Sequence, residues 1–348
     1  MSDAPVLLDP LDCLVAGPSS DSLRVGLAVP ASGILGLTGP AAVASAVLAA
    51  EEINASGGLR GRRMELVPVD AGAQPDEVVR VVDGLVAAGA IDALCGFHTS
   101  DVHRRLEVTT TGRIPYLFTP PHEGGARLPG VLLLGESPVE QMLPVVAELA
   151  GGARRTRWAL IGNDYIWPRA VHAAAGRLLG SHGAEVVMAE LVPFGRVDAD
   201  RLIDALSECR VDAVLLSLVG RDLVTFNRAF ACSPLLQRVA RVSGALDETG
   251  LLEIDGDESG ELYATMAWFA ADPDRDGFQE RYLNRWGDAA PRLGVYASGC
   301  YDGLQTLAVL HDAHLLGPDT SMDRVDAMLP HRRSRLARAE GLELLPVG

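Results

Sequence analysis

The stretch over residues 51–66 constrains the fold of this chain more than any other. It begins as the end of a helical pattern and contains Asn54 and Gly57, residue types that tolerate the left-handed backbone with which many helices end. Two further glycines let the backbone reverse before the next apolar segment. Because extended apolar patterns over 23–29 and 63–69 flank this region, the sequence predicts a strand–helix–strand unit here.

Short apolar runs alternate with amphipathic helical patterns along most of the chain. We predict strands over 23–29, 63–69, 92–97, 115–118, 131–135, 157–162, 185–192, 212–217, 239–243 and 262–269. We predict helices over 40–55, 75–88, 100–111, 138–150, 168–182, 198–208, 221–231, 273–286, 295–315 and 322–328. Several strands are apolar throughout, as is typical of parallel strands that are buried on both faces. The alternation predicts an α/β fold with parallel sheets.

The length of 348 residues favours about two domains. Residues 1–22 are rich in proline, aspartate and serine, and we expect them to be a loose leader. We expect one sheet in 23–136 and a second sheet in 137–269. The five cysteines are odd in number and widely spaced, which favours reduced thiols and gives no metal-binding pattern.

The charge excludes some functions. A formal net charge of −16 makes direct nucleic-acid binding a poor expectation, because binding phosphates needs clustered basic residues. No apolar run is as long as a membrane span. The start of the chain has neither the basic nor the apolar region of a secretory signal peptide, so we expect a cytoplasmic protein. The residues leave open whether two copies form a homodimer.

Ligands of open parallel sheets bind beyond the carboxyl ends of the strands. Thr99 and Ser100 follow the strand over 92–97, and their hydroxyl groups suit either a helix cap or a hydrogen bond to a ligand. Tyr165 and Trp167 follow the strand over 157–162 and predict an aromatic wall that also offers a phenolic hydroxyl. Packing of this helix onto the sheet is the alternative interpretation of the two aromatic residues.

Sequence motifs for common enzymes are absent. There is no nucleophile elbow, phosphate-binding loop, zinc-binding helix or dinucleotide fingerprint. His98, His103 and His122 fall near strand ends, but no glutamate or cysteine has ligand spacing to them. We therefore predict a protein that is not an enzyme and that uses no cofactor or metal, although a catalytic carboxylate pair is left open.

Three motifs carry a resemblance to a known family. They are Asn54-Ala55-Ser56-Gly57-Gly58 with Gly61, Gly96-Phe97-His98-Thr99-Ser100, and Gly162-Asn163-Asp164-Tyr165-Ile166-Trp167-Pro168-Arg169. Over about residues 23–315 the chain resembles the branched-chain amino acid, amide and urea-binding group of the type I periplasmic-binding-protein fold. The most similar branch is that of the amide-binding negative regulators of aliphatic amidase operons. The resemblance implies two Rossmann-like lobes joined by a multi-strand hinge, with about 270–348 returning to the N-terminal lobe.

The resemblance also implies the site. Ser100 and Tyr165 would hydrogen-bond a small amide, and the backbone near Phe118, Thr119, Pro120 and Pro121 and near Val219 and Gly220 would complete the pocket. The chain departs from the family at Pro120, where a threonine is usual, at Trp167 and His122, and after Leu329, where the closing hairpin is not recognisable.

A sensor that closes over a small amide, urea or amino-acid-like ligand is the expected function. In the regulators it resembles, the clamp controls an RNA-binding antitermination protein, which would be the partner here. One alternative is the substrate-binding receptor of an ABC-type uptake system for amino acids, amides or urea, and an amide hydrolase is the second. An amino acid would need an acidic partner for its ammonium group, for which Asp247 or Glu248 is a candidate.

Overall fold

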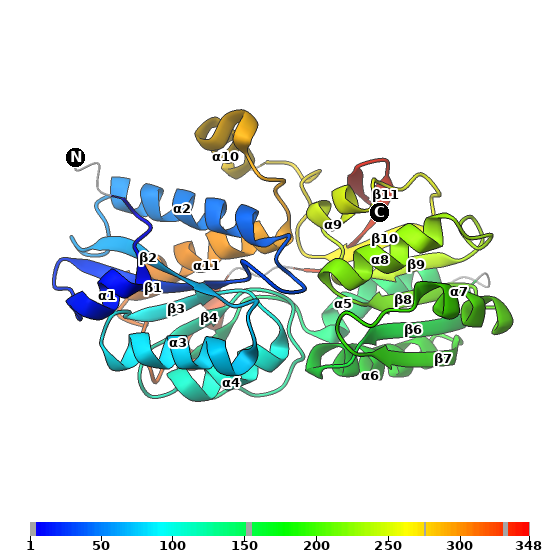
Figure 1. The fold of residues 1–348 in the computed structure, drawn as a ribbon, viewed down its shortest axis with the longest axis horizontal. Coiled ribbons are helices and arrows are strands. Elements are labelled where there is room, and N and C mark those ends of the chain that lie inside the picture. The colour runs from blue at the N-terminus through cyan, green and yellow to red at the C-terminus, as the bar shows by residue number, and fades with distance from the viewer. Residues whose placement is uncertain (1–4, 151–154, 275, 330–332, 348) are drawn as a thin grey trace.

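Two α/β lobes lie side by side in the computed structural model, which describes residues 5–150, 155–274, 276–329 and 333–347 (Figure 1). The sheet of the first lobe has the strand order β2-β1-β3-β4-β5, and all its neighbouring strands are parallel. These strands are β1 (Ser22–Val29), β2 (Arg63–Asp70), β3 (Ala93–Gly96), β4 (Tyr116–Phe118) and β5 (Val131–Leu133). The predicted parallel α/β architecture is confirmed.

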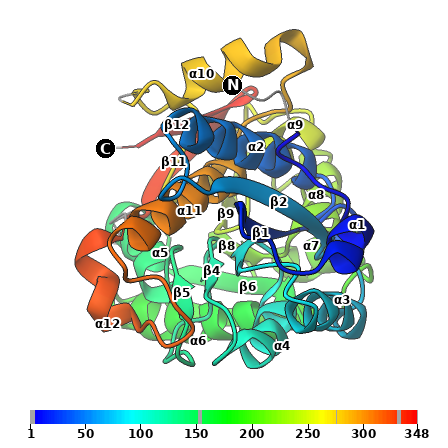
Figure 2. The same ribbon diagram turned by 90° about the vertical axis from the view of Figure 1, so that its left-hand side faces the viewer.

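Helices cover both faces of the first sheet (Figure 2). One face carries α2 (Gly39–Ala55) and α11 (Val295–Asp312), and the other carries α1 (Pro10–Ala16), α3 (Pro75–Ala87) and α4 (Ser100–Thr110). Leu27 belongs to the core under α2 and α11, whereas its neighbour Ala28 belongs to the core under α3 and α4. Successive strand residues point to opposite faces, so burial of both faces explains the unbroken apolar runs.

The second lobe contains a mixed sheet in the order β12-β11-β10-β9-β8-β6-β7. Its strands are β6 (Arg157–Asn163), β7 (Glu185–Val192), β8 (Ala213–Ser217), β9 (Ala240–Ser243), β10 (Leu262–Met266), β11 (Arg335–Glu340) and β12 (Glu343–Pro346). Its helices are α5 (Pro138–Val145), continued by a π-helical turn over Val146–Ala150, then α6 (Ile166–Ser181), α7 (Ala199–Glu208), α8 (Gly220–Ala231) and α9 (Glu248–Glu253). β11 is antiparallel to both β10 and β12, and the other pairs are parallel.

The turn after α2 is built differently from the expectation in one respect. Gly57 and Gly58 have φ angles of 104° and 71°, and the amide of Gly58 donates to the carbonyl of Ile53 at 2.9 Å. Asn54, in contrast, stays within the helix. Its side-chain amide donates to the carbonyl of Met64 at 2.9 Å and accepts from the Met64 amide at 2.7 Å, so it fixes the start of β2 rather than the end of the helix.

The expected loose leader is wrong for the residues that the structure describes, and residues 1–4 lie outside them. Leu8 donates its amide to the carbonyl of Leu66 at 2.9 Å, and Leu66 donates to Val6 at 2.8 Å, so this segment borders β2. Helix α1 follows, and its Cys13 is 2% exposed. Asp9 caps this helix and Pro10 is its first residue, so here aspartate and proline begin a helix instead of indicating a loose segment.

The assignment of the whole of 270–348 to the first lobe is also wrong at its end. Strands β11 and β12 form a hairpin that joins the second sheet at β10, so a closing hairpin is present. Leu336, Ala337 and Ala339 are buried there among charged residues that face outward. Charged residues are frequent in this short hairpin at the edge of the sheet, so its apolar face could not be recognised in the sequence.

The chain passes between the lobes at 134–137, at 267–277 and again after Leu329, as a multi-strand hinge requires. Helix α10 (Phe278–Trp286) follows the second crossing and lies beside α2 in Figure 1. Two ion pairs attach it there: Arg281 Nε lies 2.7 Å from Glu52, and Arg285 Nε lies 2.7 Å from Glu51. Helix α12 (Met322–Val325) then packs beside β5 before the chain returns. Within the described part of the chain, no helix is long and apolar enough to span a membrane.

Candidate ligand-binding site

A small cavity lies between the lobes, at the carboxyl ends of strands from both sheets. We call it the cleft pocket, and its lining residues are Leu35, Phe97, His98, Thr99, Ser100, Pro120, Pro121, Tyr165, Trp167, Val219, Gly244, Ala245 and Tyr296. Its volume is about 30 Å³, which is about the share of one molecule in liquid water. The lobes are therefore nearly closed, and a ligand of several heavy atoms needs them to separate or the lining side chains to turn.

A neighbouring hollow extends the cleft on the first-lobe side. It has a volume of about 180 Å³ and shares Leu35 and Thr99 with the cleft pocket. Asp101 and Phe194 also line it, the latter from the second lobe. A ligand held at Thr99 can thus place its body in this hollow.

Two hydroxyl groups of the first lobe are available to a ligand. Thr99 is the N-cap residue of α4, but its side chain makes no capping hydrogen bond. Ser100 is 3% exposed, and no described residue accepts or donates a hydrogen bond at its hydroxyl. The structure therefore does not use either hydroxyl as the cap that the sequence allowed. Together with the free amides of the first helical turn, they favour an electron-rich ligand atom.

Aromatic rings from both lobes form the apolar part of the lining. Phe97 and Tyr296 stack with ring centroids 5.0 Å apart, and Tyr165 lies 6.4 Å from Trp167. Burial raises the pKa of Tyr165 and of Tyr296, so both phenols keep their protons. The indole Nε1 of Trp167 is buried and has no hydrogen-bond partner among the described residues, which makes it a further donor available to a ligand.

Polar contacts position the residues that form the second-lobe side of the cleft. The carboxamide of Asn163 accepts from the Val219 amide at 2.9 Å and donates to Asp222 at 2.6 Å. The next residue, Gly220, has a φ angle of 49° and lies against the first-lobe loop that contains Ile34. The amide of Arg221 donates to the Ile34 carbonyl at 3.1 Å across the cleft. This hydrogen bond closes one side of the cleft.

The structure brings together seven of the predicted site residues and places four elsewhere. Thr99, Ser100, Pro120, Pro121, Tyr165, Trp167 and Val219 line the cleft pocket. Phe118 is buried below it and stacks on His103 with centroids 3.9 Å apart, and the Thr119 hydroxyl donates to the Gly96 carbonyl at 3.2 Å. Gly220 contacts the first lobe through its backbone. Asp247 caps α9 by accepting from the Gly250 amide at 2.9 Å.

Other lining residues were missed by the sequence reasoning. Phe97 and His98 stand directly after β3, and Gly244 and Ala245 directly after β9, so the strand-end rule contained the signal for them. Leu35 comes from the loop after β1. Tyr296 lies on α11, far along the chain, and nothing local in the sequence points to it.

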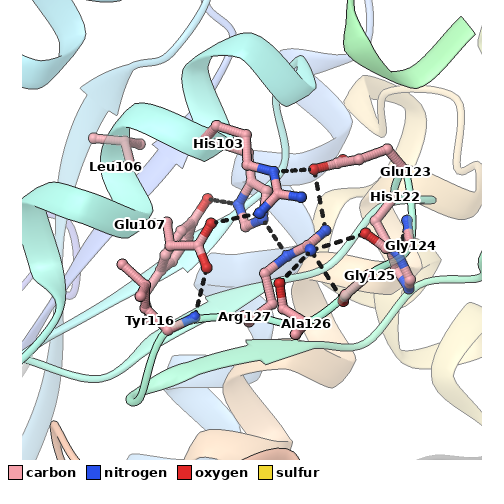
Figure 3. A network of polar contacts seen from close by, with 12 residues as sticks. His103, Leu106, Glu107, Tyr116, His122, Glu123, Gly124, Gly125, Ala126 and Arg127 are labelled. Atoms are coloured by element: carbon pink, nitrogen blue, oxygen red, sulfur yellow. Dashed lines mark hydrogen bonds and ion pairs between the residues drawn. The ribbon is translucent and has the colours of Figure 1, made fainter. Parts of the chain in front are cut away.

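A chain of hydrogen bonds runs from His98, in the wall of the cleft pocket, through Tyr116 and His103 to Arg127. Figure 3 shows its part from Tyr116 to Arg127. Tyr116 Oη lies 2.9 Å from His98 Nε2 and 2.9 Å from His103 Nδ1. On its other side, His103 Nε2 accepts from Arg127 Nε at 3.1 Å. Because the guanidinium only donates, His103 must carry its proton on Nδ1 and donate to Tyr116. Tyr116 then donates to His98 Nε2, and His98 Nδ1–H points to the Thr99 carbonyl at 3.2 Å.

This chain of hydrogen bonds holds both imidazoles neutral. Burial is the largest cause, and it lowers the pKa of His98 to about 4 and that of His103 much further. Arg127 also donates to the carbonyls of Gly124, Gly125 and Ala126 and to Glu123, and thereby orders the loop that begins at Pro120 (Figure 3). Both nitrogen atoms of His98 are occupied, so His98 forms a wall of the pocket rather than a hydrogen-bonding group.

Candidate enzymatic features are weak. Ser217 Oγ lies 3.0 Å from His172 Nε2, but Ser217 is 1% exposed and neither residue lines the cleft pocket. Burial lowers the pKa of His172 to about 4. No group of three or more potential metal ligands occurs among the residues that the structure describes.

Comparisons with known proteins agree on the fold. A family model described as periplasmic binding protein matches residues 22–328. The Leu/Ile/Val-binding protein homolog 7 of Brucella abortus (strain 2308) is 24% identical over 228 residues, which are 61% of this chain and 56% of that protein. The chain thus spans about half the length of the curated relatives it matches.

Solved structures are similar over nearly the whole chain. A solute binding protein of an ABC transporter from Rhodopseudomonas palustris BisB5, in complex with 3,4-dihydroxybenzoic acid, has a TM-score of 0.76 at 18% identity, covering 94% of this chain and 97% of that chain. The branched-chain amino acid transporter substrate binding protein LivJ from Streptococcus pneumoniae, in complex with isoleucine, has a TM-score of 0.73 at 16% identity, covering 94% and 99%. At these identities the similarity establishes the fold alone.

Proposed function

Because this chain belongs to the periplasmic binding protein family, we propose that it is a substrate-binding protein that closes its two lobes over a small molecule and serves an ABC-type uptake system. Support comes from the cleft pocket, which both lobes line, and from the ABC-transporter proteins of the same fold. Ligand contacts to both lobes stabilise the closed form over the open form, which is what a receptor for a transporter needs.

We further propose the class of ligand. The cleft pocket offers hydrogen-bond donors at Thr99, Ser100 and Trp167 and apolar surface from four aromatic rings. Its lining contains no acidic residue, lysine or arginine, and its one histidine, His98, is neutral. A carboxylate or carboxamide on an apolar or aromatic body fits this lining. An α-amino acid whose ammonium group lay within the cleft pocket fits less well, because the ammonium group would be buried there without an anion, and Asp101 lines only the neighbouring hollow. The lack of an acidic lining residue is the observation that carries the proposal, and the 3,4-dihydroxybenzoic acid complex of the similar R. palustris protein agrees with it.

The amide-binding regulator is the second candidate. An uncharged lining also suits a neutral aliphatic amide or urea, and the motif around Tyr165 resembles that branch. In that case a protein partner, such as an RNA-binding antitermination regulator, would respond to closure. Binding of aliphatic amides together with the absence of benzoate binding would favour this candidate over the receptor.

A thermal-shift screen of the purified chain tests the proposal. The compounds are benzoate, hydroxybenzoates, butyramide, urea and isoleucine, with mass spectrometry to verify that the bound compound is unchanged. A ligand that binds only the folded state raises the melting temperature by mass action. We expect a rise with the aromatic carboxylates and none with isoleucine.

A variant locates the binding in the cleft. Ser100→Ala should reduce the affinity for the compound found by about 1–3 kcal/mol, since it leaves a buried acceptor atom of the ligand unpaired. A rise with isoleucine alone would overturn the ligand class. A chemically changed compound would overturn the assignment as a binding protein.

A further inference from the structure

A second cavity, of about 340 Å³, lies beside the hinge and shares no lining residue with the cleft pocket. We call it the hinge cavity. Its lining comes from the first turn of α9, the segment after β10, helix α10, residues 290–293 before α11, and strand β12. It is more than ten times as large as the cleft pocket, so it can hold a small molecule as it stands.

Glu248 is the unusual group in its wall. The residue is only 1% exposed, and one carboxyl oxygen accepts from the Ala270 amide at 2.6 Å. The other oxygen, Oε2, has no hydrogen-bond partner among the described residues. Burial is the main cause that raises the pKa of this carboxyl to about 8. A buried carboxyl with a free oxygen is costly, and a donor in the cavity would relieve that cost.

Within the part of the chain that the structure describes, no cation forms an ion pair with Glu248. Arg292 lies on the cavity rim, but its Nη2 donates to the Leu342 carbonyl at 2.9 Å, and its effect on the Glu248 carboxyl is smaller than that of burial. Asp247 lies next to it and adds negative charge. Glu343, which is exposed, lines the same cavity and adds more. The local field therefore favours a positively charged occupant.

Apolar side chains make up much of the remaining wall. The ring of Tyr282 and the side chains of Leu283, Leu293 and Leu344 line the cavity, and Leu283 is 57% exposed at its rim. We propose that the hinge cavity is a second ligand site, for a small primary ammonium compound with an apolar body whose ammonium group pairs with Glu248.

The position of the hinge cavity gives such a ligand an effect on closure. Glu248 and Leu344 belong to the second lobe, whereas α10 is tied to α2 of the first lobe by the ion pairs of Arg281 and Arg285. A compound that contacts both sides stabilises this relative placement of the lobes. Ammonium binding in the hinge cavity therefore changes the affinity of the cleft, and by linkage a cleft ligand changes the affinity for the ammonium compound by the same factor.

Calorimetric titration of the full chain with phenethylammonium chloride tests the proposal. Glu248→Gln should weaken its binding at least about tenfold, because a charge-assisted hydrogen bond is lost. Glu258→Gln is the matched control, since it removes an exposed carboxylate of the second lobe that does not line the hinge cavity, and it should change the affinity by less than about twofold. Ser100→Ala, which alters only the cleft pocket, should also leave it unchanged.

A cavity-filling variant keeps the test independent of the buried carboxyl. Ala271→Phe enters the hinge cavity from its exposed rim and should abolish phenethylammonium binding while the chain stays folded. The proposal is overturned if phenethylammonium does not bind at millimolar concentration or if Ala271→Phe leaves its binding intact. It is also overturned if Ser100→Ala removes the binding and Glu248→Gln does not, because the amine would then occupy the cleft. These outcomes are separate from the fate of the benzoates in the thermal-shift screen.

Discussion

Closure of the cleft depends on a glycine, and Gly220→Ala should hold the lobes apart. A Cβ atom at Gly220 would lie 2.0 Å from the carbonyl oxygen of Ile34, which belongs to the other lobe. Ordinary contact begins at 3.4 Å, so the two backbones would have to separate by about 1.4 Å at this point. The same movement would stretch the hydrogen bond from the Arg221 amide to Ile34, now 3.1 Å long.

The cost of this substitution divides into two parts. The φ angle of 49° at Gly220 is unfavourable for alanine by about 1 kcal/mol in every folded form. The clash with Ile34 exists only in the closed form, and it adds about 1–3 kcal/mol there, as overpacking does. We therefore expect a small loss in the free energy of unfolding, but a loss of about 5- to 150-fold in cleft-ligand affinity.

Chemical denaturation, ligand titration and small-angle X-ray scattering measure the two parts. Scattering should give a larger radius of gyration for Gly220→Ala than for the unsubstituted chain. Gly176→Ala in α6 is the control, because a Cβ there meets nothing within 4 Å and alanine favours the helix. The reasoning fails if Gly220→Ala keeps both the ligand affinity and the scattering curve of the parent chain.

Three stability predictions use buried polar groups, each measured by urea denaturation. Tyr116→Phe breaks the hydrogen bonds to two buried imidazoles and should lower the free energy of unfolding by about 2–4 kcal/mol. Tyr282→Phe is the control, because it loses one hydrogen bond to a carbonyl and should cost about 1 kcal/mol. Equal costs would contradict the proposed hydrogen-bond chain. The pKa of Glu248 is raised from 4.5 to about 8, so between these pH values the folded state retains a proton that the unfolded state releases, and this stability is lost progressively as the pH rises from 4.5 to about 8. Glu248→Gln should gain up to about 5 kcal/mol relative to the parent chain between pH 4.5 and 8, and an unchanged difference would refute the shift. Asp257→Ala leaves the fully buried Arg241, now 2.6 Å away, without its anion and should cost about 3–5 kcal/mol, with a cost below 1 kcal/mol as the contrary result.

Local patterns explain how much of the fold could be predicted. The apolar runs and the glycine turn after α2 fix the backbone over a few residues at a time, so strands such as β1 and β7 and helices such as α4 begin and end close to the expected residues. The short α9 and the hairpin β11–β12 were missed. These elements are short and rich in charged residues, so they contain too few apolar residues for a helix or strand period to be recognised.

Part of the cleft pocket followed from the same reasoning. Parallel strands that share a direction bring their following loops to one edge of a sheet, so Ser100 and Pro120 meet in one lobe, and Tyr165 and Val219 meet in the other. The sequence could not separate Asp247, which caps α9, from the residues that line the pocket. Both kinds of residue follow a strand, and only the direction of the side chain distinguishes them.

The sequence by itself determined the elements, their alternation and the two-lobed α/β class, because helix and strand periods and turn residues act over short distances. Only the tertiary structure decided which distant segments meet. It placed Tyr296 of α11 against Phe97, closed Gly220 onto Ile34, and set Glu248 in a cavity beside the hinge rather than in the cleft. Such contacts depend on how the two lobes and the three crossings of the chain fit together. Contacts between residues that are distant in the sequence produce no local periodic pattern, so the sequence alone could not predict them.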